Sequence, residues 1–372
     1  MNILTLNIGS SSIKYKAFDS MLTPIISGNI TGIGTKLFSW PELPDCPEAS
    51  NHIEALQSLA TLIAAKGLKF DAICHRIVHG GAKFTKPCKI DANLIAELNK
   101  VANLAPLHNP IQIEAIKIAQ TIFSDTAQYA FFDTAFHNTM PKSQKVIPIS
   151  GFAEIQKYGF HGLNYAYIND LLTNKHKSPI TAIICHLGNG ASVCGIKNGN
   201  SYSTSMSMTP NAGLIMGTRS GDIDAGAIIY LLNSGLSVND VDNLINKQSG
   251  LQALCGTSDM RQCEQLAIDG DAHASLALEA FAERVIFYIG GYLALLGQID
   301  CLVFTGGIGE NSALIRNKII ARLSHLNFLL DTKSNLNNAE VISSPTSNDI
   351  YIYKANEEKY MAEYILNRCY NK

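Results

Sequence analysis

Apolar residues near the start of the chain form two short runs that are separated by a polar turn. Residues 3–8 (ILTLNI) and 13–18 (IKYKAF) are rich in strand formers, which predicts two strands with a tight connection. The polar side chains in and beside the turn are those of Asn7, Ser10, Ser12 and Lys14. Together with Gly9, which lets backbone N–H groups approach a ligand, they are typical of a phosphate cradle. A solvent-exposed, Ser-rich turn that binds no ligand would have the same sequence pattern.

The same pattern returns in the second half of the chain. Residues 182–196 (AIICHLGNGASVCGI) again contain an apolar run, a glycine-rich polar turn and a second apolar run, and His186 lies 179 residues after Asn7 at the equivalent place. A repeat at about half of the chain length predicts two related domains. We expect the two turns to face a shared cleft and to handle phosphate.

A third glycine-rich segment lies at 302–312 (LVFTGGIGENS). We expect a strand, a turn, and then a helix at SALIRNKIIARL with Glu310 and Asn311 in the N-cap position. The start of a helix favours the negative end of a nucleotide. Glycine-rich turns from strand to helix are also common without any ligand.

Longer periodic segments predict helices at 51–65, 92–101, 110–123, 272–296 and 357–370. Strand–turn–strand units followed by helices in each half predict two α/β domains with mixed sheets. The polar segment 331–349 predicts a surface loop. The apolar run 285–297 is shorter than the roughly 20 residues that span a bilayer, so we expect a buried helix and no membrane partner.

Composition and charge narrow the class of protein further. A chain of 372 residues exceeds what one core usually serves, so two domains are expected. A net charge of -2 argues against nucleic-acid binding through bulk charge. The nine cysteines form no C-x-x-C pair, and reduced thiols in the cytoplasm are the simplest account. The N-terminal segment predicts a strand and lacks the features of a signal peptide.

Two arginines lie beside glycines at the ends of apolar segments. Arg76 is in HRIVHGG, and Arg219 is in GTRSGDID, just before Asp222 and Asp224. An arginine can hold a carboxylate or phosphate with two hydrogen bonds and can neutralise the charge of a transferring phosphoryl group. A structural arginine bound to backbone carbonyls, or to one of the two aspartates, is an equal alternative.

Three further polar residues are candidates for chemistry. Asp133 follows an apolar strand in FFDTAFH, where a carboxylate would lie over a cleft. His108 (LAPLHNP) and His161 (KYGFHGL) lie in short loops next to proline or glycine. A capping aspartate and hydrogen-bonded loop histidines would be the ordinary structural explanation of these three positions.

Taken together, the motifs resemble those of the acetate, propionate and butyrate kinases, a family of the actin-like ATPase superfamily. They run in the family's order over nearly the whole chain, as N-x-G-S-S-S-x-K at 7–14, HRIVHGG at 75–81, LAPLHNP at 104–110, FDTAFH at 132–137, YGFHG at 158–162, HLGNGAS at 186–192, TP at 209–210, MGTRSGDID at 216–224, SDMR at 258–261, FTGGIGEN at 304–311 and NEE at 356–358.

The resemblance implies an α/β fold of two duplicated actin-like, ribonuclease-H-like domains, each with a β-β-β-α-β-α-β-α core, facing across a cleft. The first would comprise residues 1–147 with the last helix, 359–372, and the second, nucleotide-binding domain would comprise 148–358. A homodimer is also implied.

The resemblance also implies a role for each matching residue. The catalytic residues would be Asp133, His161, Arg219 and Arg76. The carboxylate substrate would contact Arg76, His108, Val78, Leu107, Phe160 and Pro210. ATP would bind at Lys14, His186, Leu187, Gly188, Asn189, Gly190, Asp259, Met260, Arg261, Gly306, Gly307, Ile308, Gly309, Glu310 and Asn311. Ser10 and Ser12 would handle phosphate, and Mg²⁺ or Mn²⁺ would bind at Asn7 and Glu357.

The chemistry fits this reading of the residues. A short carboxylate is ionised at neutral pH and needs no general base, so Asp133 would organise an arginine or the metal instead of accepting a proton. We expect direct in-line transfer, Mg-ATP + acetate ⇌ acetyl phosphate + ADP, with closure of the two domains to exclude water. The sequence departs from the usual family pattern at Ser203 and Ala212, where acidic residues are missing.

Several other functions are compatible with the same residues. Propionate kinase is the main alternative, because one methylene changes the free energy of binding by only about 1–3 kcal/mol. Butyrate kinase is a further alternative, which is distinguished by the volume of the substrate pocket. A sugar or polyol kinase would use Asp133 as a base. A nucleotide switch of the actin or chaperone type would not need Arg76, His161 and Arg219.

Overall fold

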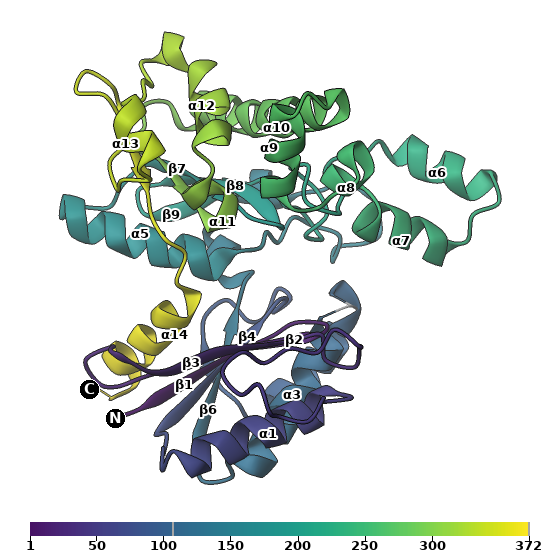
Figure 1. Cartoon of the computed structure of the whole chain (residues 1–372), viewed down its shortest axis with the longest axis vertical. Helices are drawn as coiled ribbons and strands as arrows, with labels where there is room; N and C mark the ends of the chain where they lie inside the picture. Colours follow the sequence, from purple (N-terminus) through teal and green to yellow (C-terminus); the bar gives the residue numbers. More distant parts are fainter. Residues whose placement is uncertain (106–107, 371–372) are drawn as a thin grey trace. The chain divides into compact units, whose positions relative to one another are not determined.

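The structure is a computed structural model that describes residues 1–105 and 108–370. The chain forms two compact units (Figure 1). The first unit comprises Met1–Phe136 and Asn356–Lys372, and the second comprises His137–Ala355. The boundaries predicted from the resemblance lie after residues 147 and 358.

The first unit is built on a six-stranded sheet with the strand order β3-β2-β1-β4-β6-β5. Its strands are β1 (Ile3–Ile8), β2 (Ser12–Phe18), β3 (Pro24–Thr31), β4 (Ala72–Ile77), β5 (Cys88–Lys89) and β6 (Ala127–Phe132). β1, β2 and β3 are antiparallel neighbours, whereas β4 is parallel to both β1 and β6. The register pairs Leu6 with His75 and Ile77 with Phe132. Asn7, Arg76 and Asp133 therefore lie at the same end of three adjacent strands.

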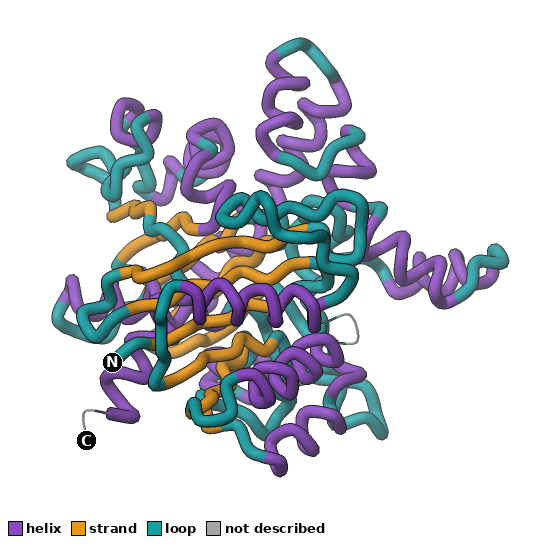
Figure 2. The backbone as a smooth tube through the Cα atoms, turned by 60° about the horizontal axis from the view of Figure 1, so that its bottom comes forward, coloured by secondary structure: helices purple, strands orange, loops and turns teal. Residues whose placement is uncertain are grey.

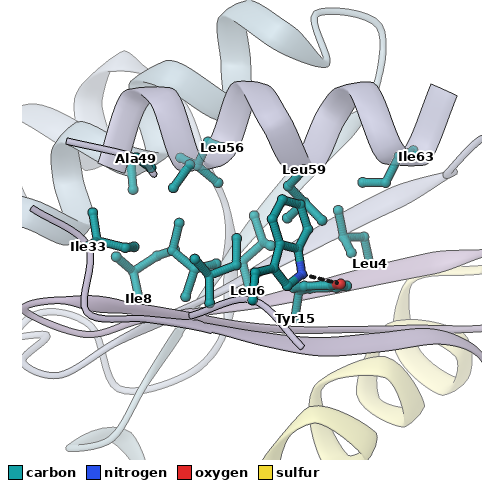
Figure 3. Close-up of a cluster of buried hydrophobic side chains, with 14 of the residues drawn as sticks. Leu4, Leu6, Ile8, Tyr15, Ile33, Ala49, Leu56, Leu59 and Ile63 are labelled. Atoms are coloured by element: carbon teal, nitrogen blue, oxygen red, sulfur yellow. Dashed lines mark hydrogen bonds between the residues drawn. The ribbon is translucent and has the colours of Figure 1, made fainter. Parts of the chain in front are cut away.

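Helices cover both faces of this sheet. The helices of the first unit are α1 (His52–Ala65), α2 (Ala92–Lys100), α3 (Asn109–Ile122) and α14 (Glu357–Ile365), with short helical turns at η1 (Ala102–Leu104) and η4 (Leu366–Tyr370). α1 begins where the Asn51 side chain accepts a hydrogen bond from the Glu54 N–H, as expected for an N-cap. Figure 3 shows Leu56, Leu59 and Ile63 of α1 against the strands, with α14 beyond the opposite side of the sheet.

One polar contact lies inside this apolar core. The Trp40 Nε1–H donates a hydrogen bond of 3.1 Å to the Tyr15 hydroxyl, drawn in Figure 3. Because both side chains are buried, the bond satisfies an indole N–H that would otherwise be left without a partner.

The second unit repeats the arrangement of the first. Its five-stranded sheet has the order β11-β10-β7-β8-β9. The strands are β7 (Ala182–Leu187), β8 (Ala191–Lys197), β9 (Asn200–Thr204), β10 (Cys301–Thr305) and β11 (Asp349–Ile352). β7, β8 and β9 are antiparallel and β10 is parallel to β7 and β11, as β1, β2, β3, β4 and β6 are in the first unit. The predicted duplication is confirmed, and the strands of both sheets appear in orange in Figure 2.

The helices of the second unit cover its sheet and extend from it. They are α4 (Lys142–Lys145), α5 (Gly162–His176), α6 (Ala225–Asn233), α7 (Val238–Lys247), α8 (Gly250–Cys255), α9 (Met260–Ile268), α10 (Ala272–Leu296), α11 (Gly306–Asn311), α12 (Ala313–Ala321) and α13 (Thr332–Leu336). Short 3-10 turns are η2 (Ala135–Thr139), at the junction of the units, and η3 (Ser324–Leu326). None of the helices described is both long enough and apolar enough to cross a membrane.

The third glycine-rich segment differs from its prediction. Glu310 and Asn311 lie within α11 and do not cap the following helix. Instead, the Ser312 hydroxyl caps α12 by accepting a hydrogen bond from the Ile315 N–H. The Glu310 carboxylate accepts from the Gly306 N–H at the start of α11, which satisfies a donor that a helix leaves free. Helix formation therefore begins directly after the strand.

The polar segment 331–349 is also more ordered than a surface loop. It contains α13, which is capped by the Asp331 side chain. The buried Asn335 accepts a hydrogen bond of 2.7 Å from Arg316 Nε. The Arg316 guanidinium, which is fully buried, also donates to the Asn338 side chain. Asparagines of this segment thus satisfy a buried charge, a pairing that the residue composition did not reveal.

Candidate active site

The first unit brings Arg76, Asp133 and Asn7 into direct contact. Arg76 donates from Nε to Asp133 Oδ1 over 2.9 Å and from Nη2 to Asp133 Oδ2 over 2.5 Å. Its Nη1 donates to Asn7 Oδ1 over 2.9 Å. Asp133 is buried and Arg76 is 19% exposed. This planar, two-bond pairing fixes the direction of the guanidinium and leaves N–H groups of both Nη atoms available to a further anion.

Two more carboxylates lie close to this pair. Glu357 Oε2 is 3.5 Å from Arg76 Nε, and Glu358 Oε1 is 2.7 Å from Lys14 Nζ. Burial raises the pKa of Glu357 to about 7; Arg76 and Lys14 act in the opposite direction, and Asp133 and Glu358 raise it further. Burial alone would lower the pKa of Arg76, but the neighbouring carboxylates raise it overall. The cluster holds three acidic and two basic side chains, so a cation would be favoured there.

The second unit brings together two histidines, His186 near the carboxyl end of β7 and His161 directly before α5. The rings of His161 and His186 stack with their centroids 4.2 Å apart. His161 precedes α5 and has a φ of 59°, in the left-handed region, which is uncommon for a residue other than glycine. Asn164 Nδ2 donates to His186 Nδ1 over 2.8 Å. A strained backbone conformation of this kind is often found at functional sites.

Arg219 lies next to the histidines and over the glycine-rich turn after β7. A Cβ atom built on Gly190 would lie 2.6 Å from Arg219 Nη2 and 3.5 Å from His161 Nε2. Glycine at this position therefore allows the two side chains to approach the turn closely.

The Arg219 guanidinium has no carboxylate partner among the described residues. It donates from Nη1 to the Pro210 carbonyl over 2.6 Å, and burial lowers its pKa to about 10. Asp222, a partner allowed by the sequence, accepts instead from the Gly213 N–H and the Tyr288 hydroxyl. Asp224 caps α6. A guanidinium that is partly desolvated and has no counterion is suited to bind an anion.

A pocket of about 800 Å³ opens beside these residues in the second unit. Of the residues predicted to bind ATP, those that line it are Gly188, Asn189, Asp259, Met260, Arg261, Gly307, Ile308 and Asn311. It is also lined by Ser258, Glu264 and Ser312, which were not assigned to ATP; Ser258 and Ser312 lie in the quoted segments 258–261 and 302–312, whereas Glu264 lies outside every motif. Glu264 lies one helical turn after Met260 on α9, so the helical spacing could have revealed it. Its carboxylate accepts a hydrogen bond from the Ser312 hydroxyl.

The other residues assigned to ATP have different surroundings. Leu187 is buried in β7, and Gly306 and Gly309 are buried in α11. The φ of Gly306 is 78°, and a Cβ there would lie 2.7 Å from the Leu187 carbonyl oxygen. Glu310 accepts hydrogen bonds from two backbone N–H groups. These positions shape the backbone behind the pocket. Lys14 belongs to the first unit and pairs with Glu358.

The residues assigned to the carboxylate substrate are distributed over both units. Val78 is buried in the first unit, and His108 directly precedes α3. Phe160 is buried in the second unit, where Pro210 holds Arg219 through its carbonyl. Leu107 lies outside the described residues. In the first turn, the exposed Ser10 and the half-buried Ser12 stand close to Gly9, whose N–H donates to the Ser12 carbonyl.

Comparisons with known proteins show which family the chain belongs to. The model of the Acetokinase family matches residues 2–363. The acetate kinase of Francisella tularensis subsp. holarctica (strain OSU18) is 39% identical over 97% of this chain and 98% of its own. A solved structure of a propionate kinase from Francisella tularensis subsp. tularensis SCHU S4 has a TM-score of 0.92 at 38% identity, over 97% of this chain and 98% of that one. An acetate kinase structure from Entamoeba histolytica has a TM-score of 0.88 at 31% identity, with 98% of each chain covered. The chain therefore belongs to the Acetokinase family, as its motifs predicted.

Proposed function

We propose that this protein is an acetate kinase, which transfers the γ-phosphoryl group of ATP to the carboxylate of acetate and catalyses the reverse reaction. The observation that carries the proposal is Arg219, a partly desolvated guanidinium that has no carboxylate partner among the described residues and lies beside His161 and a glycine-rich turn. Charge that develops on the equatorial oxygens of a transferring phosphoryl group would be neutralised by such an arginine.

In this proposal the nucleotide occupies the pocket of about 800 Å³ in the second unit. Gly188 and Gly307 would let backbone N–H groups approach its phosphates, since a Cβ on Gly188 would lie 4.0 Å from the Gly307 nitrogen. Arg219 and His161 would contact the phosphoryl group that is transferred.

The carboxylate substrate would bind to Arg76, whose direction is fixed by Asp133. Both carboxylate oxygens of Asp133 accept hydrogen bonds from Arg76, so Asp133 is poorly suited to remove a proton from a hydroxyl group. This favours a carboxylate, which needs no base, over the alcohol substrate of a sugar kinase.

We propose that Mg²⁺ acts with ATP and is held near Glu357 and Asn7. Magnesium is bound by one or two carboxylates together with substrate phosphates and waters. The pKa of Glu357 is raised by burial and also by the neighbouring carboxylates of Asp133 and Glu358, and this group of acidic side chains fits a cation at this place. When bound, the metal would neutralise phosphate charge.

Acetate and propionate should be distinguished by the rate of acyl phosphate formation, measured as hydroxamate after reaction with hydroxylamine. We expect kcat/KM to fall from acetate to propionate and from propionate to butyrate, by roughly tenfold or more for each added methylene, because the buried Val78 limits space. Val78→Ala should reduce these differences. A higher kcat/KM for propionate would establish the alternative activity, and the absence of acyl phosphate from all three would refute the kinase proposal.

We also propose that the protein forms a homodimer through the second unit. α6 buries none of its residues, and Ile229 and Tyr230 are 58% and 71% exposed. Two large apolar side chains exposed next to each other favour contact with another protein surface over contact with water. A second copy of the chain is always present in solution, so we propose it as the partner. Sedimentation should give a dimer, which Ile229→Glu with Tyr230→Glu converts to a monomer. Lys247→Glu on the neighbouring α7 is the matched control, and a monomeric wild-type protein would contradict the proposal.

A cytoplasmic location is consistent with the thiols. Eight of the nine cysteines have described side chains and these eight are free, although Cys255 Sγ and Cys263 Sγ are 3.3 Å apart. We therefore propose that the protein works in a reducing compartment.

A further inference from the structure

Two cysteine thiols lie in contact beside one wall of the pocket in the second unit. Cys255 is the last residue of α8, and Cys263 lies at the end of the first turn of α9 (Figure 1). Their Sγ atoms are 3.3 Å apart. The sulfur atoms of a disulfide are about 2.05 Å apart, so a bond between these two requires them to approach each other by about 1.2 Å.

The two thiols differ in their access to solvent. Cys263 is fully buried, whereas Cys255 is half-buried. Burial raises the pKa of Cys263 to about 12, so Cys255 is the thiol that an oxidant in solution reaches first. Their other contacts are with backbone carbonyl oxygens: Cys255 Sγ is 3.2 Å from that of Leu251 and 3.7 Å from that of Thr257, and Cys263 Sγ is 3.8 Å from that of Ala274. Thiols are weak donors, so these contacts do not hold the two sulfur atoms apart.

The chain between the two cysteines forms a wall of the pocket. Residues 256–262 join them. Four residues of this segment line the pocket, namely Ser258, Asp259, Met260 and Arg261. The Asp259 side chain caps α9 by accepting a hydrogen bond from the Arg261 N–H, so the segment and the start of the helix are held together. Drawing its two ends closer therefore changes the shape of this wall.

We infer that Cys255 and Cys263 form an oxidisable pair whose disulfide weakens nucleotide binding in the adjacent pocket. The oxidant is a peroxide. Hydrogen peroxide transfers one oxygen to Cys255 Sγ, which gives a sulfenic acid and one water. Cys263 Sγ then attacks Cys255 Sγ: the S–S bond forms, the S–O bond breaks, and the hydroxide leaves with the Cys263 proton as a second water. A thiol such as glutathione reverses the reaction, which suits a reducing compartment.

The inference goes beyond the proposed function, and only its effect on affinity rests on the proposed nucleotide site. Linkage gives that effect a second expression. A disulfide that weakens nucleotide binding must itself be disfavoured by bound nucleotide, by the same factor. We therefore expect ADP to oppose disulfide formation when the pair is equilibrated in a glutathione buffer.

Mass spectrometry of the full-length protein tests the bond. After treatment with hydrogen peroxide and alkylation of the remaining thiols, trypsin cuts behind Arg261 and places the two cysteines on separate peptides, 248–261 and 262–284. A disulfide links these peptides, and dithiothreitol separates them. Cys46→Ser, which removes a half-buried thiol of the first unit, is the control and should keep the link. Oxidation of Cys255 to sulfenic or sulfinic acid without the linked peptides would overturn the inference.

Calorimetric titration with Mg-ADP tests the consequence for the pocket. In the wild-type protein, peroxide should raise the Kd for ADP about fivefold or more, the lower end of the usual coupling between two sites, and dithiothreitol should restore it. Cys263→Ser should show no such change. A disulfide that leaves the Kd unchanged would refute the effect on the nucleotide. If the reduced protein binds no ADP while the linked peptides form, the proposed nucleotide site is wrong and the disulfide stands. Thermal unfolding of each sample identifies any loss of fold.

Discussion

Replacement of Arg219 by alanine is expected to lower kcat for acetyl phosphate formation by about 10³-fold or more, the scale of an arginine that neutralises a transferring phosphoryl group. The reason is local. Arg219 makes one hydrogen bond, to a backbone carbonyl, and has no carboxylate partner in the described part of the chain. Its charge is therefore available to the substrate. The loss should appear in kcat with the hydroxamate assay, whereas the unfolding temperature should change little.

Arg322→Ala provides the control for this experiment. Arg322 also belongs to the second unit, but its side chain is 61% exposed and pairs with Glu283. An exposed ion pair contributes little to stability, so this variant should keep wild-type turnover. Turnover of Arg219→Ala within tenfold of the wild-type rate would remove Arg219 from the mechanism.

Replacement of Asp133 by alanine should reduce stability and activity together. Asp133 is 1% exposed and binds Arg76 through both oxygens. Removal of one partner of a buried pair costs about 3–5 kcal/mol, because the other charge is left without its counterion. We expect this loss in the free energy of unfolding. Activity should also fall at least about 10²-fold, since Arg76 would lose its fixed direction.

Two further variants show whether the effect belongs to the buried pair. Asp133→Asn keeps an acceptor oxygen for Arg76 but removes the charge, so its stability should be intermediate. Glu97→Ala removes an exposed contact with Lys83 and Lys100 of the same unit and should change the free energy of unfolding little. Equal stability of Asp133→Ala and the wild-type protein would show that Asp133 is not needed to neutralise Arg76.

The sequence was sufficient to predict the duplicated fold. Asn7 and His186 occupy equivalent positions in β1 and β7, each followed by a polar turn and an antiparallel strand. The repeated pattern is readable because a buried strand requires apolar residues wherever it occurs. The N-terminal end of α1 could also be predicted from the sequence, because the cap residue Asn51 is next to the helix in the chain.

Contacts that depend on packing could not be predicted in the same way. The sequence allowed Arg219 to pair with Asp222 or Asp224, yet these bind Tyr288 and the start of α6. Nothing in the order of residues shows that Ser192 Oγ of β8 lies within hydrogen-bond distance of both His161 Nδ1 and the Tyr165 hydroxyl. Such bonds depend on which strand and helix come together, and a linear pattern records only what lies near in the chain.

The last helix of the chain has a consequence for the order of folding during synthesis. α14 buries Met361, Ala362 and Ile365 and packs on β1, β2 and β4, so it completes the core of the first unit. The second unit consists of residues 137–355 and can fold as soon as these have left the ribosome. The first unit cannot complete its core until α14 has been translated, although most of its residues are translated before those of the second unit. We therefore expect chains that are released early to have a folded second unit and an incomplete first one.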